Sequence, residues 1–202
     1  MDTKIVAIED DIAKDRKLRR DIIIWEAVGW LIIFGFGNLF HFYYEWVPWK
    51  GYGWFFAINE SMWEHIKLAF WPALIFYTIQ YFVLRKRTEK IIVAKAIALY
   101  VGPIVMLAFY YTMVGVFGEE IKSIWLSIIT FIFATVIQQL SSYALLTIKP
   151  VIDKKKQKIL DIISLVVVGL LMIAMIVFTY VQPQIDLFYD TYNATYGFLP
   201  TT

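Results

Sequence analysis

The chain has 202 residues, of which 60% are hydrophobic and 18% aromatic, and its formal net charge is +2. The apolar fraction exceeds the roughly 45–50% typical of soluble globular domains, so the composition predicts an integral membrane protein. The chain contains no cysteine, which excludes disulfides, thiolate nucleophiles and cysteine-based metal sites and leaves histidine and carboxylate as metal ligands. The sequence also lacks a P-loop, a dinucleotide fingerprint, a serine nucleophile elbow and a nucleic-acid module, so we expect neither soluble cofactor chemistry nor a nucleic-acid partner.

Residues 1–21 form a charged N-terminal segment in which Ile5, Ile8 and Ile12 recur at helical spacing. This pattern predicts either an amphipathic helix on the cytoplasmic membrane surface or a flexible, solvated segment. The apolar stretch that follows is too long for a signal-peptide core and lacks a small-residue cleavage pattern, so we expect it to remain attached.

Five apolar stretches are each long enough, at about 1.5 Å per residue, to cross a hydrocarbon core of about 30 Å. They cover residues 22–46, 61–84, 91–117, 121–148 and 159–181. The sequence therefore predicts an all-α polytopic transmembrane helix bundle. Gly35-Phe36-Gly37-Asn38 predicts an interruption of the first span. The fifth has few polar residues on any face, which predicts a helix largely exposed to lipid.

Basic residues are segregated along the chain, and 16 of the 19 Lys and Arg lie in residues 1–21, 85–95 and 149–158. By the positive-inside rule these segments face the cytoplasm, which places the N-terminus inside and the C-terminus outside. The expected organisation is a cytoplasmic segment (1–21), a five-span transmembrane domain (22–181) and an extracytoplasmic tail (182–202). We expect the protein to be located in the cell membrane.

Both histidines lie where the first two spans reach the outer surface. Successive residues of a helix are rotated by about 100°, so Asn38, His41 and Glu45 fall on one face of the first span. Ser61, Glu64 and His65 likewise share one face of the second. Because the connecting loop has only about a dozen residues, we expect the two faces to converge in an outward-facing pocket. Ionisable groups just inside a membrane boundary are costly unless paired, wetted or coordinated, so they indicate a functional site. The predicted pocket residues are Asn38, His41, Glu45, Glu60, Ser61, Glu64 and His65.

The first interpretation of this pocket is a metal site in which His41, Glu45, Glu64 and His65 bind divalent Zn, Mn or Fe. A bound metal lowers the pKa of its water, so Glu64 and His65 become candidate catalytic residues for hydrolysis of a membrane-embedded substrate. The candidate residues for binding that substrate or a polar headgroup are Asn38, Glu60, Ser61, Asp186 and Asp190.

Two other interpretations start from the same residues. A metal-free Glu/His acid–base pair or proton-linked site favours a small-solute transporter or channel. Alternatively, Ser61 and Glu64 form a capping box and His41 pairs with Glu45 at i, i+4, as in a structural or sensor subunit. The partners expected from these interpretations are membrane lipid, a small-molecule or lipid substrate and, in a homo-oligomer, further copies of the chain.

Other polar residues lie near the inner surface. Four residues of the fourth span either line a polar path or, as we favour, form interhelical hydrogen bonds; they are Gln138, Gln139, Ser141 and Ser142. Glu26 lies in the first turn of the first span, where we expect it to reach water.

Two segments carry a resemblance to a known family. Residues 59–67 read Asn-Glu-Ser-x-Trp-Glu-His-x-Lys, and residues 41–46 read His-Phe-x-Tyr-Glu-Trp. Both resemble signatures of an uncharacterised family of small prokaryotic polytopic membrane proteins, as does the acidic tail with Tyr196-Gly197. The resemblance implies a multi-span bacterial membrane protein without an established activity. It also suggests that the tail covers the site with Asp186 and Asp190.

Overall fold

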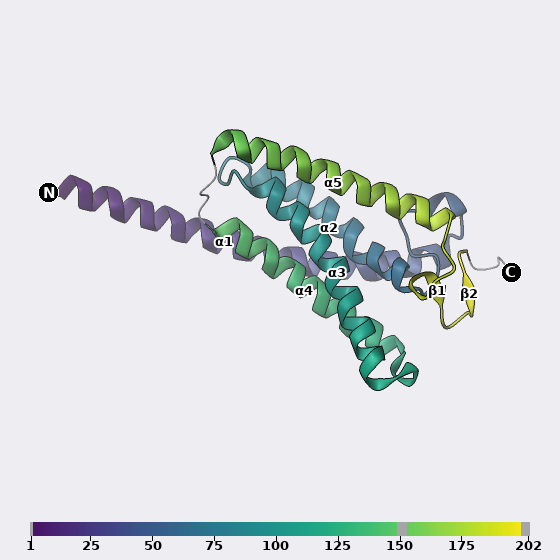
Figure 1. Ribbon diagram of the computed structural model, residues 1–202. Helices are drawn as coiled ribbons and strands as arrows, with labels where there is room; N and C mark the ends of the chain where they lie inside the picture. Colours follow the sequence, from purple (N-terminus) through teal and green to yellow (C-terminus); the bar gives the residue numbers. More distant parts are fainter. Residues whose placement is uncertain (1, 149–152, 199–202) are drawn as a thin grey trace.

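The computed structural model describes residues 2–148 and 153–198, and for residues 2–8 it describes the backbone only. Five helices account for most of the chain: α1 (Asp2–Trp46), α2 (Met62–Leu84), α3 (Ile91–Phe117), α4 (Ile124–Thr147) and α5 (Lys154–Tyr180). All five are long and apolar enough to cross a membrane, so the prediction of an all-helical protein with five such segments is confirmed (Figure 1).

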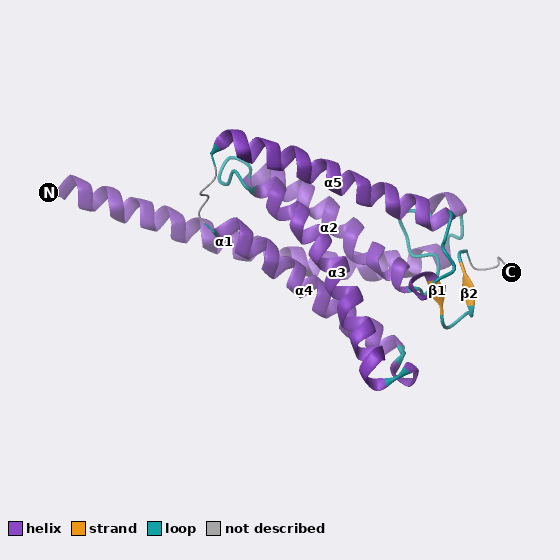
Figure 2. Cartoon of the chain, in the orientation of Figure 1, coloured by secondary structure: helices purple, strands orange, loops and turns teal. Residues whose placement is uncertain are grey.

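Short elements lie between the helices and after α5. They are the 3-10 turns η1 (Lys50–Tyr52), η2 (Glu119–Ile121) and η3 (Asp186–Phe188), and the strands β1 (Tyr189–Asp190) and β2 (Thr195–Tyr196). The two strands pair antiparallel and form a hairpin after α5 (Figure 2). Part of the predicted basic connector, residues 149–152, lies outside the described residues.

Helix α1 runs without a break for 45 residues. Residues 2–21 are therefore its first part rather than a separate segment, and they project beyond the other helices (Figure 1). The predicted interruption at residues 35–38 was wrong. A glycine inside a helix costs only about 1 kcal/mol relative to alanine, which packing against neighbouring helices can offset.

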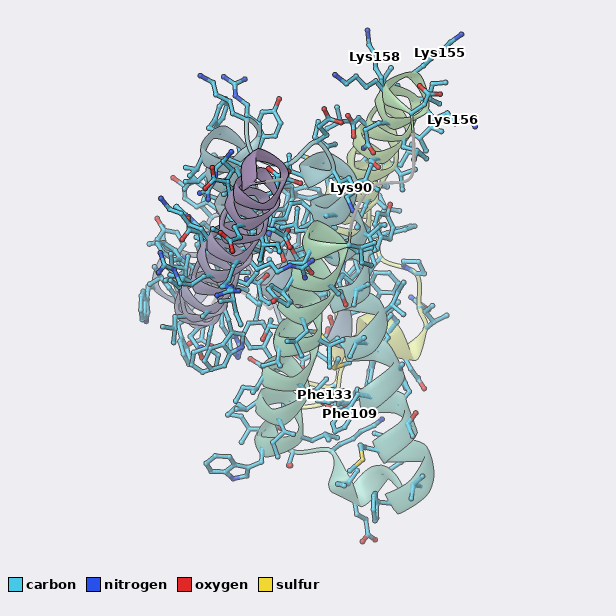
Figure 3. The ribbon with its side chains drawn as sticks, turned by 90° about the vertical axis from the view of Figure 1, so that its left-hand side faces the viewer. Lys90, Phe109, Phe133, Lys155, Lys156 and Lys158 are labelled. Carbon is cyan, nitrogen blue, oxygen red and sulfur yellow. The ribbon has the colours of Figure 1, made fainter. Side chains whose placement is uncertain are left out.

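Helix α2 is the most buried helix, with 61% of its apolar window buried, against 17% for α5. Helices α3 and α4 pack along one another, with Phe109 and Phe133 in contact at 4.9 Å between ring centres (Figure 3). Helix α1 packs on α2 and α4, and α5 packs mainly on α3. The predicted exposure of the fifth helix is thus confirmed, and α2 is the helix with the largest buried share.

The bundle has two chemically different ends. At the histidine end, α1 and α5 finish, α2 begins and the hairpin folds over (Figure 1). At the basic end, α2 and α4 finish and α3 and α5 begin. A small apolar layer closes the basic end; its fully buried members are Ile22, Leu84, Ile91, Ala94 and Leu146.

Two glycines of α1 have opposite surroundings although they are two residues apart. A Cβ atom on Gly37 would lie 2.5 Å from Cζ of Phe131 and 3.0 Å from the backbone oxygen of Leu68, whereas a Cβ atom on Gly35 would have open space. Gly37 therefore permits the close approach of α1 to α2 and α4, as small residues do between membrane helices.

These surroundings predict effects of opposite sign for the same substitution. We expect Gly37→Ala to lower the free energy of unfolding by about 1–3 kcal/mol, because an added methyl overpacks the contact. Gly35→Ala should raise it by up to about 1 kcal/mol, because alanine favours the helix. Thermal unfolding in detergent measures both; equal effects would contradict the proposed contact.

Candidate functional site

Two imidazoles and one carboxylate converge at the histidine end. His41 lies near the end of α1, Glu60 in the loop before α2, and His65 in the first turn of α2. One ligand atom of each lies within 4.8 Å of the other two. His41 Nε2 is 3.6 Å from one oxygen of Glu60, and His65 Nε2 is 3.7 Å from the other. Glu60 therefore lies between the imidazoles, with one oxygen toward each.

The start of α2 determines how His65 is oriented. The Ser61 hydroxyl accepts a hydrogen bond from the Glu64 backbone N–H, and the Ser61 N–H donates to Asn59 Oδ1. Nδ1 of His65 lies 2.9 Å from the Ser61 carbonyl oxygen. Because a carbonyl can only accept, Nδ1 carries the proton, and the lone pair of Nε2 points toward Glu60. Helix capping and histidine orientation thus come from the same turn.

The C-terminal hairpin is hydrogen-bonded to the loop that carries Glu60. Oδ2 of the fully buried Asp190 accepts from the Glu60 backbone N–H at 3.1 Å. The Asp190 carboxylate also accepts from the backbone N–H groups of Tyr192 and Asn193 and from the Asn193 side chain. Asn59 Nδ2 donates to the Gly197 carbonyl oxygen at 2.8 Å. Strand β1 and the residue that follows β2 therefore help to position the backbone of the site.

The pKa values of the Glu60 and Asp190 carboxyl groups are shifted in opposite directions. Burial raises the pKa of Glu60; His41 opposes this shift, while Asp190 and Glu45 add to it. For Asp190, burial also acts to raise the pKa, but hydrogen bonds from Asn193, Glu60 and Tyr192 outweigh it and lower the pKa. Asp190 is therefore a stable anion, whereas Glu60 is a carboxyl group whose ionised form a bound cation would stabilise.

The other predicted site residues lie around this group or apart from it. Glu45 is exposed one turn beyond His41, and Asp186 is exposed in η3. The amide of the exposed Asn38 donates to the Phe34 carbonyl oxygen of its own helix. Glu64 belongs to a separate cluster described below. The structure thus brings together His41, Glu60 and His65, of which the sequence-based ligand set contained only the histidines.

A cavity of about 40 Å³ adjoins the two histidines between α1, α2 and α4. Asn38 and Ser127 are the other polar residues on its walls. The remaining lining residues are Phe34, Gly37, Leu68, Ile124, Ile128 and Phe131. This volume has room for a few water molecules or a small apolar group beside the imidazoles.

Residues 15–198 match the sequence model of a family of unknown function, DUF6512. The chain belongs to this family. Comparison with curated proteins and with solved structures gives no match. The resemblance to an uncharacterised family is thus confirmed at the level of the family.

Glu64 and Lys67 form an ion pair in which both side chains are fully buried. Lys67 Nζ also donates to the Gly53 carbonyl oxygen at 2.6 Å and to the Thr179 hydroxyl at 3.1 Å. Glu64 accepts a further hydrogen bond from the Ile58 backbone N–H. The pair therefore joins the loop before α2, α2 itself and α5. The Ser61 half of the predicted capping box is present, whereas the Glu64 side chain bonds Ile58 rather than the helix start.

A second buried ion pair lies one helical turn inside the basic end. Glu26 is only 4% exposed, so the expectation that it reaches water was wrong. Lys95 Nζ lies 2.6 Å from Glu26 Oε1 and 2.7 Å from the Ser142 hydroxyl. Gln139 Nε2 donates to the Glu26 carbonyl oxygen. The interhelical hydrogen bonds predicted for α4 are confirmed for Gln139 and Ser142. Ser141 bonds its own helix, and the buried Gln138 amide has no hydrogen-bond partner among the described residues.

Sequence reasoning missed this pair because Lys95 was counted among the basic residues of the inner loop. The signal available was its position inside an apolar stretch, since opposite charges within spans are expected to pair with one another.

The Glu64–Lys67 pair yields a stability prediction. We expect Glu64→Gln and Lys67→Met each to lower the free energy of unfolding by about 3–5 kcal/mol, because each leaves a buried charge unpaired. The double variant should lose less than the sum. Glu119→Gln is the matched control, because Glu119 also pairs with a lysine at i+3 but is 74% exposed; its cost should be below about 1 kcal/mol. Thermal unfolding in detergent tests this, and additive losses would contradict a shared ion pair.

Proposed function

We propose that the protein binds a divalent transition metal through His41 Nε2, the Glu60 carboxylate and His65 Nε2. The observation that carries the proposal is the convergence of these three donors within 4.8 Å. In a tetrahedral zinc site with bonds of about 2.0–2.1 Å, donor atoms lie about 3.4 Å apart. The distances from Glu60 to the imidazoles, 3.6 and 3.7 Å, are close to this value but involve different carboxylate oxygens, so the side chains would have to draw together to coordinate one ion.

The three metal-binding side chains and the hydrogen bonds that hold them favour a catalytic metal site. Two imidazoles and one carboxylate leave a fourth position for water, and this combination suits Zn, Mn or Fe. The bond from His65 Nδ1 to the Ser61 carbonyl holds the ring in the tautomer that a ligand requires. Asp190 holds the Glu60 backbone. The proposed set keeps the two histidines of the sequence-based set and takes Glu60 in place of Glu45 and Glu64.

The surroundings suggest hydrolysis of an amphiphilic substrate at the membrane surface. When bound, the metal would lower the pKa of a water molecule and supply a nucleophile at headgroup depth. The apolar walls of the adjoining cavity, including Leu68 and Phe131, would accept an apolar part of the substrate and exclude bulk water. In the orientation expected from the basic residues, this end faces the outside of a prokaryotic cell.

Metal analysis of the purified protein tests the ligand set. After loading with Zn, Mn or Fe and desalting, we expect about one ion per chain for the wild type and a loss for Glu60→Gln and for His41→Ala with His65→Ala. Loading should fall on acidification, because protonated imidazoles and carboxyl groups cannot coordinate a metal.

Glu45→Gln is the control, because Glu45 is exposed one turn from His41 and should keep its metal. Loss of bound metal in Glu45→Gln but not in Glu60→Gln would instead support the ligand set predicted from the sequence. A wild type that retains none of the three metals would discard the metal site and leave these residues as hydrogen-bonding links between helices.

Proton-linked transport is the second candidate, and the buried Glu26–Lys95 pair is the observation that favours it. The apolar layer with Ile22 and Leu84 closes the basic end beyond this pair, so transport requires a second, open conformation. Because the chain has no native cysteine, Ile22→Cys and Leu84→Cys can be probed with an impermeant maleimide. Transport predicts that labelling appears under an imposed proton gradient, with exposed Lys155→Cys as the positive control. Protection of both positions under every condition would reject this candidate.

A further inference from the structure

A lateral cavity of about 380 Å³ opens between α2, α3 and α5. Its walls are mainly aliphatic and aromatic, and they include Leu74, Phe82, Leu99 and Val168; the buried Lys95 is the charged residue among them. It exists because α5 packs mainly on α3 and leaves part of α2 uncovered. The volume lies within the range of about 300–1,000 Å³ that small-molecule sites occupy.

A second cavity of about 310 Å³ continues the first toward the basic end. Tyr81, Ile91 and Ile92 line both cavities, so the two are contiguous. The second is polar: its charged residues are Arg85, Lys154 and Lys158, together with the acidic Glu89 and Asp161. An apolar compartment beside α2 thus leads directly into a compartment with three basic groups at the end of the helices.

The basic groups in the polar compartment are largely available to a ligand. Within residues 2–148 and 153–198, neither Arg85 nor Lys158 forms an ion pair with an acidic side chain, and Lys154 lies 4.0 Å from an exposed Glu89. Asp161 accepts a hydrogen bond from Gln157. The Arg85 guanidinium rests on the rings of Tyr81 and Phe82, at 5.7 and 5.6 Å. This stacking holds the group at the cavity mouth while its N–H donors stay free for an anion.

We propose that the joined cavities bind an anionic phospholipid. Its phosphate pairs with Arg85, Lys154 and Lys158, and one acyl chain lies in the apolar compartment between α2, α3 and α5. A free phosphate ion would leave the apolar compartment empty, and a zwitterionic headgroup would bring its own cation toward the basic groups. Basic pockets between membrane helices at a cytoplasmic surface are suited to anionic headgroups.

The start of α5 supplies a matched control. Lys155 and Lys156 project from the same turn as Lys158 (Figure 3), and neither lines either cavity. Arg85→Gln with Lys158→Gln removes two positive charges from the proposed site. Lys155→Gln with Lys156→Gln removes the same charge from the neighbouring surface, so a general electrostatic attraction to anionic lipid affects both variants equally.

Lipid titration of the full chain in a neutral detergent tests the proposal, with the thermal midpoint as one readout and native mass spectrometry as the other. Phosphatidylglycerol should raise the midpoint of the wild type and give a retained lipid adduct, whereas phosphatidylcholine and inorganic phosphate should do neither. The Arg85/Lys158 variant should need at least a tenfold higher phosphatidylglycerol concentration for the same shift, and the Lys155/Lys156 control should match the wild type.

Three results would overturn the proposal. They are equal shifts with phosphatidylglycerol and phosphatidylcholine, a shift with inorganic phosphate alone, and equal losses in the two double variants. If the Arg85/Lys158 variant does not fold, the comparison of lipids on the wild type decides, because only a selective anionic adduct supports the site.

Discussion

The histidine end depends on the buried Glu64–Lys67 ion pair. Two charges removed from water are tolerated only when they pair and their remaining donors and acceptors are bonded. Lys67 meets this condition with the carbonyl of Gly53 and the hydroxyl of Thr179. Glu64 meets it in part, because Lys67 and the Ile58 N–H both bond Oε2, whereas the buried Oε1 has no hydrogen-bond partner among the described residues. The pair thereby fixes the loop between α1 and α2 against α2 and α5. Glu60 lies in that loop, so the position of the site carboxylate follows from an ion pair that takes no part in ligand binding.

The basic end also contains a buried ion pair that links several helices. Glu26 and Lys95 pair between α1 and α3, and Ser142 of α4 completes the group. An apolar residue lies one turn further toward the basic end on each of the first four helices, at Ile22, Leu84, Ile91 and Leu146. This layer lies between the ion pair and the basic surface, while Lys95 also lines the lateral cavity between α2, α3 and α5. The amide of Gln80 in α2 also donates to Glu26 at 3.5 Å, so the polar group joins four helices and acts as a structural link.

Helix α2 connects the two proposed ligand sites. Its first turn carries His65 and follows directly on Glu60, while its last turns carry Tyr81 and Leu84 and lead to Arg85. Because α5 covers α2 only in part, the basic end has a lateral cavity, whereas the histidine end is covered by the hairpin. A ligand between α2, α3 and α5 would therefore contact the helix that carries His65, which is the most buried of the five helices.

Hydrophobic length and helical period were enough to predict five apolar helices, because a backbone in lipid must satisfy its hydrogen bonds within each helix. The short loop between the first two spans was enough to place His41 and His65 at one end. Only the tertiary structure decided which carboxylate they face. Glu64 lies on the predicted helix face, but Lys67 one turn later takes its carboxylate, and Asp190, 130 residues further along the chain, holds the Glu60 backbone in place. Sequence periodicity describes single helices, whereas competition among buried charges is settled by which partners the fold brings within bonding distance.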